Sequence, residues 1–272
     1  MLHLIKQCLR IAATSLLAFP VLVAGREGAQ ASPVSVGKEI QAQVHLKVNN
    51  YYVLFTAPDV SYIDANNRLM LPLRAVGELL GADVNYDAKL HSATVSLAKH
   101  QVELTLNANT ALYDGTIVKL DTMPVMKQGQ FFIPAKVLLN GLHIKAEYEE
   151  SLLSISIPDG SERRSITQRL NEFGEFQTVG HFRPLYFKMN LPPAGSKDKR
   201  ISLTFVAKNV SGNDLPAGTE DFHTADVTIG GYGFSDPVPE RSREAVPAGS
   251  TYEVNRTLYA SEGSLKYILV SE

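Results

Sequence analysis

The stretch NRLMLPLRAVGELLGADVNYDAKLHSATVSL, residues 67–97, decides the fold that we predict for the N-terminal half of the chain. Residues 69–71 predict a short buried strand, and Pro72 follows where a helix begins, because the N–H that proline lacks would have no intrahelical partner there. Apolar residues then recur at helical spacing until Gly81, which supplies the left-handed residue that ends many helices. Alternating residues up to Leu97 predict a hairpin.

A shorter copy of the same pattern occupies residues 130–157. Residues 131–133 replace the first strand, Pro134 begins the second helix, and Gly141 ends it before two more alternating strands. Each copy alone would expose the apolar face of its helix, so we expect the two copies to share one core. The sequence therefore predicts an α+β N-terminal domain built from two strand-helix-hairpin repeats.

Two further hairpins are predicted beside these copies. Residues 40–48 alternate as one half-buried strand, and Asn49-Asn50, which both tolerate positive φ, turn it into residues 51–56. Between the copies, Asp114-Gly115 is a strong signal for a two-residue hairpin turn.

Three segments together resemble a known family: VNNYYVLF at residues 48–55, LPLRAVGELLGADVNYD at residues 71–87 and FFIPAKVLLNGLHI at residues 131–144. They are similar to the N-terminal stalk domain of copper amine oxidases, a module found in many exported proteins of Gram-positive bacteria. The resemblance covers roughly residues 40 to 157. In the amine oxidases this domain is remote from the copper, so the resemblance implies no catalysis, and we predict no cofactor.

The triplet Asn85-Tyr86-Asp87 also occurs in copper amine oxidases, which make their quinone cofactor from the tyrosine of such a motif. That chemistry needs a copper ion held by three histidines, two of them in a His-x-His pair. No two histidines of this sequence are separated by one residue. We therefore predict that Tyr86 packs in the core under the helix.

The first 31 residues predict a secretory signal peptide that is cleaved off. Lys6 and Arg10 precede an uncharged run at residues 11–24, and Ala29-Gln30-Ala31 has the small-x-small pattern that precedes cleavage. This run is shorter than the roughly 20 residues that span a bilayer, so we predict no transmembrane anchor after cleavage; an uncleaved anchor is the alternative. We expect the protein to be secreted or associated with the cell wall.

The composition fits an ordinary globular protein of two domains, with 44% hydrophobic, 20% charged and 8% aromatic residues among 272. A formal net charge of −2 argues against a nucleic-acid partner.

The C-terminal part predicts an all-β, immunoglobulin-like sandwich. A linker helix at residues 159–175 precedes it, with Ser161 as the N-cap and Gly174 as the end. From residue 176, alternating segments are separated by Pro, Gly and Asn turns without a helical period. The predicted strands are residues 185–189, 201–208, 225–229, 250–256 and 265–270. The predicted division is therefore a signal peptide (1–31), a stalk-like domain (32–158), the linker helix (159–175) and the sandwich (176–272).

Two groups in the sandwich segment are candidate sites. Asp221 and His223, with further acidic residues beside them, form the densest cluster of metal-ligand types; a solvated loop between two strands is the alternative. Tyr232 and Phe234 lie in a glycine-rich segment that could offer an aromatic contact to a glycan or protein; a hairpin tip is the alternative.

These features predict an exported, non-catalytic protein of the cell envelope that acts in adhesion, scaffolding or ligand binding. Its expected partner is a cell-wall polysaccharide or an envelope protein. One alternative is an envelope enzyme or metal-dependent hydrolase with a site between the domains. Another is an accessory or inhibitory subunit of a larger partner.

Overall fold

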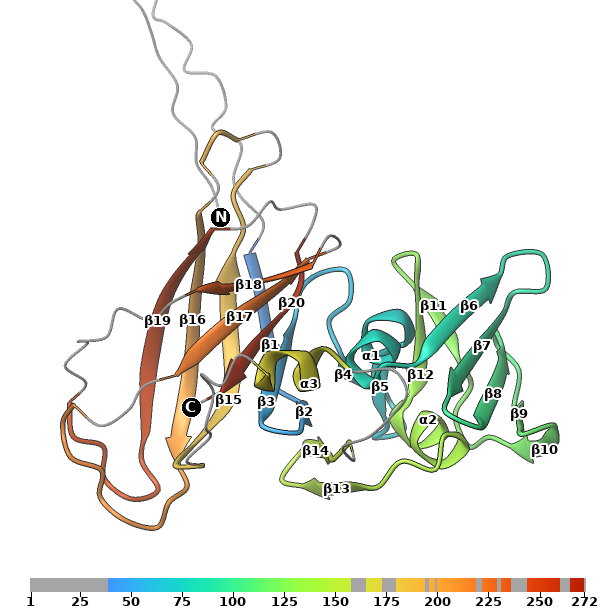
Figure 1. The fold of residues 1–272 in the computed structure, drawn as a ribbon, viewed down its shortest axis with the longest axis horizontal. Helices are drawn as coiled ribbons and strands as arrows, with labels where there is room; N and C mark the ends of the chain where they lie inside the picture. The colour runs from blue at the N-terminus through green and yellow to red at the C-terminus, as the bar shows by residue number, and fades with distance from the viewer. Residues whose placement is uncertain are drawn as a thin grey trace, which may run out of the picture. The chain divides into compact units, whose positions relative to one another are not determined.

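The computed structural model of the chain (Figure 1) describes the residues in the following ranges: 39–157, 165–172, 180–193, 196–198, 200–218, 222–228, 231–235, 244–259 and 265–271. The predicted signal peptide, residues 1–31, lies outside the described residues.

A seven-stranded sheet joins the two ends of the described chain. Its order is β13 (Ala146–Glu149), β14 (Leu152–Ile155), β2 (Leu46–Val48), β3 (Tyr51–Phe55), β20 (Leu265–Ser271), β17 (His223–Thr228) and β18 (Gly231–Ser235). The last described strand, β20, therefore lies between β3 and β17, and the blue and red strands are neighbours in Figure 1. The pairing of β14 with β2 is parallel, and the other pairings in this sheet are antiparallel.

A four-stranded antiparallel sheet packs against one face of the seven-stranded sheet. Its order is β1 (Glu39–Gln43), β15 (Phe182–Asn190), β16 (Arg200–Asn209) and β19 (Thr251–Tyr259). Leu54 of β3 and Ile268 of β20 share a hydrophobic core with Phe187 and Phe205 of the four-stranded sheet. Because side chains alternate across a strand, this core takes every second residue of β3 and β20.

The remaining residues of β3 and β20 enter a second core on the opposite face. Val53 and Phe55 of β3 and Tyr267 of β20 belong to this core, together with Val76 and Leu79 of a helix. All five residues of β3 are consequently buried. The seven-stranded sheet is thus covered on both faces at β3 and β20, as in a three-layer arrangement.

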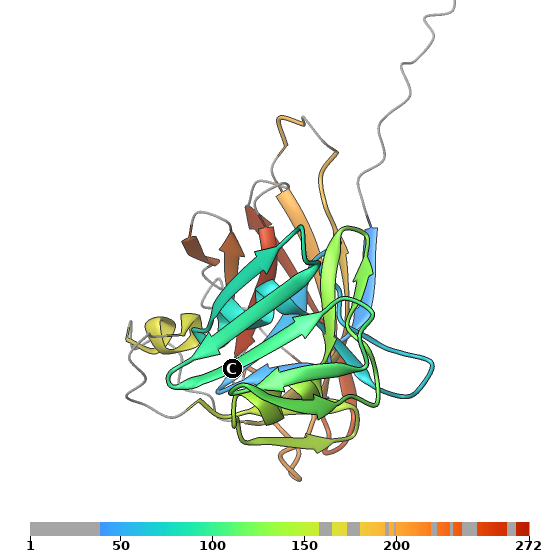
Figure 2. The ribbon, with the colours of Figure 1, turned by 90° about the vertical axis from the view of Figure 1, so that its right-hand side faces the viewer.

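Two smaller antiparallel sheets and three helices form the rest of the described structure. The five-stranded sheet has the order β10 (Thr116–Lys119), β9 (Thr110–Tyr113), β8 (His100–Thr105), β7 (Ser92–Leu97) and β6 (Asp83–Asp87). The other sheet has the order β11 (Val125–Lys127), β12 (Gln130–Pro134), β5 (Leu69–Pro72) and β4 (Tyr62–Ile63). The helices are α1 (Leu73–Leu80), α2 (Ala135–Gly141) and α3 (Ile166–Asn171). Figure 2 shows the teal to green strands of the five-stranded sheet side by side.

The predicted α+β class with two strand-helix-hairpin repeats is wrong. Among the described residues the protein is mostly β, with 54% in strands, 10% in helices, and four sheets. The hairpins that follow the two helices do not form equivalent units, because β6 and β7 belong to the five-stranded sheet while β13 and β14 belong to the seven-stranded sheet. The sandwich part of the prediction agrees with the two packed sheets, and β15, β16, β17, β19 and β20 correspond to the five predicted C-terminal strands, although β19 begins at Thr251 and residue 229 lies outside the described residues.

Strand pairing crosses the predicted boundary between residues 158 and 176. Residues 40–48 were expected to form one strand, but this segment divides at Val44, whose N–H donates to the carbonyl of Leu185 at 2.8 Å. Before that point β1 pairs with β15, and after it β2 pairs with β3 and β14. The two segments of the chain therefore contribute strands to the same sheets.

The helix ends depend on different residues. α1 begins after Pro72 and ends at Gly81 with φ 75°, as predicted. In α2, however, Gly141 is helical and the positive φ, 53°, belongs to His143. α3 begins after Ser165: the Ser165 hydroxyl accepts from the Gln168 N–H, and the Gln168 side chain accepts from the Ser165 N–H, which is a capping box. The predicted helix ends, Ser161 and Gly174, lie outside the described residues. None of the helices described is long and apolar enough to cross a membrane.

Candidate functional site

A pocket of about 220 Å³ opens where the five-stranded sheet, the β11–β12 hairpin and the start of α1 meet. Its lining is mostly apolar and aromatic, with one guanidinium and one amide among the side chains. The lining residues are Leu73, Arg74, Val84, Tyr86, Ala93, Met126, Gly129, Gln130 and Phe131.

The β11–β12 hairpin supplies one wall of this pocket. Gln128 and Gly129 have φ values of 51° and 77°, the backbone conformation of a tight two-residue turn that matches the twist of the flanking strands. This turn sets the register in which Met126 lies opposite Phe131. Of the three side chains that this hairpin brings to the pocket, Met126 and Phe131 are therefore cross-strand neighbours, and Gln130 is the third.

An aromatic pair connects the two sheets at the pocket. The rings of Tyr86, on β6, and Phe131, on β12, lie edge to face with centroids 5.9 Å apart and an interplanar angle of 67°. The prediction that Tyr86 packs in the core is wrong, because Tyr86 is 38% exposed. Asp87 has a local role in the turn that follows, where its carboxylate accepts from the N–H groups of Lys89 and Leu90. With Met126 40% exposed, the pocket presents apolar surface to the solvent.

The lining favours binding over chemistry. Acid–base catalysis needs a titratable group whose pKa lies near the working pH, and nucleophilic catalysis needs an activated hydroxyl, thiol or amine. The described side chains that line the pocket include no Asp, Glu, His, Cys, Ser or Lys, and the phenol of Tyr86 is the one hydroxyl among them. Arg74 instead offers a permanently charged, planar donor group suited to carboxylate or phosphate.

A second group of functional side chains lies at the other end of the five-stranded sheet. His100 begins β8, Asp114 lies in the β9–β10 turn, and His143 follows α2. The Nδ1 atom of His100 lies 2.8 Å from Oδ2 of Asp114, and Nε2 of His143 lies 3.9 Å from the same oxygen. The two imidazole rings are stacked with centroids 4.1 Å apart and an interplanar angle of 22°. Two imidazoles thus face one carboxylate oxygen.

Backbone geometry holds Asp114 in this position. Asp114 and Gly115 have φ values of 48° and 80°, so the predicted two-residue turn is confirmed. The Asp114 N–H donates to the Gln101 carbonyl at 2.9 Å, and the Gln101 N–H donates to Oδ1 of Asp114 at 2.7 Å. The hydrogen bond from His100, followed by that from the Gln101 N–H, lowers the pKa of the Asp114 carboxyl. The carboxylate is therefore ionised and oriented toward the histidines.

A close approach of α2 brings His143 to the other two residues. A Cβ atom added at Gly141 would overlap the Val102 side chain and would lie 2.9 Å from a ring carbon of Tyr113. Val102 is two residues from His100 along β8, and Tyr113 immediately precedes Asp114. Glycine at 141 therefore permits the contact that assembles the group.

A partly buried charged group lies elsewhere, between α1 and β20. The Lys266 ammonium donates to both oxygens of Glu78, at 2.9 and 2.7 Å. Oδ1 of Asp59 is buried without a hydrogen-bond partner, and burial raises the pKa of this carboxyl. Nearby charges contribute less: Lys266 and Arg74 lower the pKa, and Glu78 raises it. This group ties α1 to the C-terminal strand.

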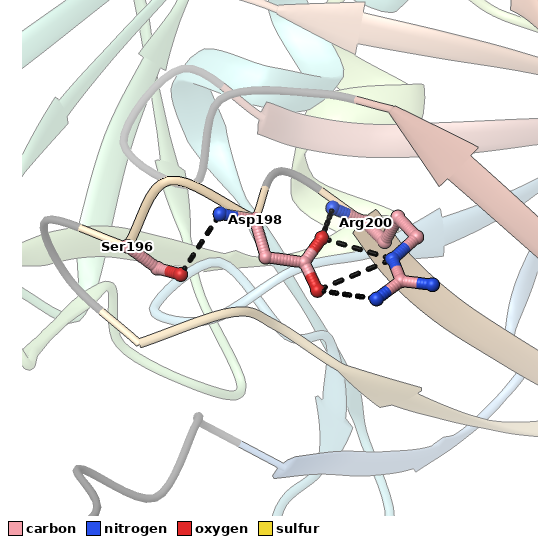
Figure 3. A network of polar contacts seen from close by, with 3 residues as sticks. All are labelled: Ser196, Asp198 and Arg200. Atoms are coloured by element: carbon pink, nitrogen blue, oxygen red, sulfur yellow. Dashed lines mark hydrogen bonds and ion pairs between the residues drawn. The ribbon is translucent and has the colours of Figure 1, made fainter.

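A polar network at the start of β16 consists of hydrogen bonds within one short segment of the chain (Figure 3). The Asp198 carboxylate accepts from the Arg200 backbone N–H and guanidinium at 2.8 to 3.2 Å, and the Asp198 N–H donates to the Ser196 hydroxyl at 3.1 Å. The hydrogen bonds from Arg200 lower the pKa of Asp198 to about 2. The network closes a turn between β15 and β16.

The structure does not test the sites predicted from the sequence, so they stay predictions. Asp221 lies outside the described residues, and His223 begins β17, opposite Ser271. Tyr232 and Phe234 lie on β18, the last strand of the seven-stranded sheet, and their side chains are not among those described.

Sequence reasoning missed both of the groups that the fold assembles. The sequence singles out Tyr86 by its Asn-Tyr-Asp motif, but no local pattern predicts that Tyr86 lines one pocket with Met126 and Arg74. His100, Asp114 and His143 have no recurring spacing, since they come from a strand start, a hairpin turn and a helix end. The pattern Asp114-Gly115 predicts the turn, but no local pattern predicts that His100 and His143 lie beside it.

No curated protein matches this chain. The N-terminal domain of copper amine oxidases, as a family, is non-catalytic. The resemblance predicted from the sequence is confirmed: residues 47–157 match the family model of the copper amine oxidase N-terminal domain.

Proposed function

We propose that this protein is an exported, non-catalytic binding module of the cell envelope, and that its ligand is an anionic cell-wall polysaccharide held at the pocket of Tyr86, Phe131 and Arg74. The observation that carries the proposal is the lining of that pocket, which combines exposed apolar side chains with a guanidinium. The match of residues 47–157 to a non-catalytic domain supports the same conclusion.

The chemistry of the lining fits a charged sugar polymer. Aromatic rings offer flat apolar surface to the C–H faces of sugar rings, and guanidinium groups form paired hydrogen bonds with carboxylates and phosphates. The pocket volume of about 220 Å³ is below the roughly 300–1,000 Å³ usual for whole small-molecule ligands. It therefore suits one unit of a longer chain.

Export is proposed from the N-terminal sequence. Basic residues precede the uncharged run at residues 11–24, and Ala29-Gln30-Ala31 supplies a cleavage pattern. N-terminal sequencing of the protein recovered from the host envelope and medium tests this directly. Export predicts a first residue of Ser32; recovery of an intact N-terminus from the cell interior would contradict it.

The binding test is a pull-down of the full chain on isolated cell walls, with the Tyr86→Ala and Arg74→Gln variants. We expect wild-type binding to saturate and to weaken about tenfold in each variant, because each loses a contact of roughly 1–2 kcal/mol. Tyr148→Ala is the matched control, since Tyr148 is 59% exposed and lies on β13, outside the pocket lining.

Two results would contradict the proposed pocket. If the Tyr86→Ala variant bound cell walls as tightly as the Tyr148→Ala variant, the ring of Tyr86 would not contact the ligand. Loss of binding in Tyr232→Ala or Phe234→Ala, with Tyr86→Ala unaffected, would move the site to β18, as the sequence predicted.

A further inference from the structure

We propose that His100, Asp114 and His143 bind a divalent transition-metal ion of the Zn²⁺ class. This site is independent of the polysaccharide pocket, and it differs from the metal site predicted at Asp221 and His223.

The donor set selects the class of metal. Imidazole nitrogen suits zinc, copper, nickel and iron, whereas calcium and magnesium prefer oxygen ligands. Two imidazoles with one carboxylate match the ligand types of protein zinc sites that keep a position open. The site should therefore discriminate against Ca²⁺ and Mg²⁺.

The distances are close to those that a bound ion requires. Zinc–nitrogen and zinc–oxygen bonds of about 2.0–2.2 Å in a tetrahedral arrangement place ligand atoms about 3.3–3.5 Å apart. The two histidine nitrogens lie 2.8 and 3.9 Å from Oδ2 of Asp114. One potential ligand atom from each of the three residues lies within 4.8 Å of the others. Shifts of about 1 Å, which side-chain rotation can supply, would complete the triangle.

The protein backbone holds the three ligands on separate elements. The reciprocal hydrogen bonds between Asp114 and Gln101 orient the carboxylate, and the contact of Gly141 with Val102 and Tyr113 positions the segment that carries His143. These supports limit the entropy lost when an ion binds, because the ligands are already together. The stacked rings already bring one nitrogen of each histidine toward Oδ2 of Asp114.

The exposure of the site determines its expected character. The side chains of His100, Asp114 and His143 are 22%, 41% and 61% exposed. An ion held by three ligands at the surface keeps at least one coordination position open to water or to an external donor. We therefore expect an exchangeable site that a chelator empties without unfolding the protein.

The test is Zn²⁺ binding to the chelator-treated full chain, measured by competition with a chromophoric chelator. We expect one equivalent of Zn²⁺ and at least tenfold weaker binding in each of His100→Gln, His143→Gln and Asp114→Asn. Asparagine also tolerates positive φ, so Asp114→Asn preserves the turn while it removes the ionised ligand. Zinc-edge X-ray absorption of the loaded protein should show two imidazoles at about 2.0–2.1 Å.

The matched control is His91→Gln. His91 is also an exposed histidine with positive φ, 51°, and it lies in the turn of the β6–β7 hairpin of the same sheet. Its substitution should leave the affinity unchanged. Circular dichroism of every variant establishes that the fold is intact. The proposal is overturned if the wild type binds no stoichiometric Zn²⁺, if His143→Gln binds as tightly as His91→Gln, or if Ca²⁺ competes equally.

Discussion

The two copies of the repeated pattern begin alike and are anchored differently. Each has a strand, a proline and a short helix in sequence, but α1 is tied to β20 by the Glu78–Lys266 ion pair. The end of α2 is instead held by contact between Gly141 and the side chains of Val102 and Tyr113. Both copies have a helix glycine whose added Cβ would overlap a valine side chain, Val84 for Gly77 and Val102 for Gly141, but only the first copy adds the ion pair to β20.

The difference shows that a repeated local pattern need not produce a repeated tertiary role. The hairpin after α1 forms part of the wall of the pocket lined by Tyr86 and Phe131, whereas the end of α2 carries His143 to the proposed metal site. A local pattern specifies helix and strand, but packing partners decide which residues meet. Each of the following changes tests one side of this comparison, from the largest expected effect to the smallest.

Gly141→Ala should be the most destabilising change. The added methyl group would overlap Val102, which is fully buried, and press on the Tyr113 ring. Overpacking of this kind costs about 1–3 kcal/mol, and we expect the upper end because the neighbours cannot withdraw. Denaturant unfolding at constant m-value measures the loss, and Zn²⁺ affinity should fall in the same variant.

The matched change in the first copy is Gly77→Ala. Its Cβ would meet the Val84 side chain, which is only half-buried and borders the pocket. Alanine also gains about 1 kcal/mol of helix propensity over glycine, so we expect a net effect within about 1 kcal/mol of zero. Equal losses in the two variants would show that the copies are anchored in the same way.

Lys266→Met should cost about 1–2 kcal/mol, because it leaves Glu78 without its two charge-assisted hydrogen bonds. A double-mutant cycle with Glu78→Gln isolates the pair, and we expect a coupling free energy of about 1 kcal/mol. A coupling near zero would indicate that packing alone holds α1 against β20.

Asp59→Asn should stabilise the protein at pH 7. Burial raises the pKa of the Asp59 carboxyl in the folded state, so folding favours its protonated form. Below the unfolded pKa, near 3.8, the carboxyl is protonated in both states and does not lower the free energy of unfolding. As the pH rises above 3.8 and through the folded pKa, this carboxyl lowers the free energy of unfolding. The neutral amide avoids that loss, and the advantage of the variant should disappear as the pH approaches 3.8. Unfolding curves across this range would contradict the assignment if the wild type were more stable at pH 7.

Asp198→Ala should have the smallest effect. The carboxylate is fully exposed, so solvent screens its ion pair with Arg200, and we expect no measurable change in the unfolding midpoint. NMR titration of the carboxyl carbon should nevertheless give a pKa of about 2. A clear loss of stability would mean that exposed and buried ion pairs count equally here.

Local features of the sequence predicted several parts of the structure correctly. Pro72 and Gly81 bound α1, and Asp114-Gly115 forms the expected turn, because these depend on the φ and ψ preferences of single residues. α2 also ends at Gly141, as predicted, but this glycine serves there as a packing contact with Val102 and Tyr113, and the positive φ belongs to His143. α3 begins with a capping box of Ser165 and Gln168, which is likewise a property of residues close in the sequence.

The sequence by itself determined the alternation of strands, the turns, the ends of α1 and the family resemblance of residues 47–157, because these are properties of neighbouring residues. Only the tertiary structure decided that β20 pairs with β3, that β1 pairs with β15, and that His100, Asp114 and His143 face one another. Backbone hydrogen-bonding groups are the same in every strand, so a strand's own pattern does not name its partner. The pairing of strands follows from which apolar faces can be buried together. Strand pairing in turn decides which functional side chains lie close together.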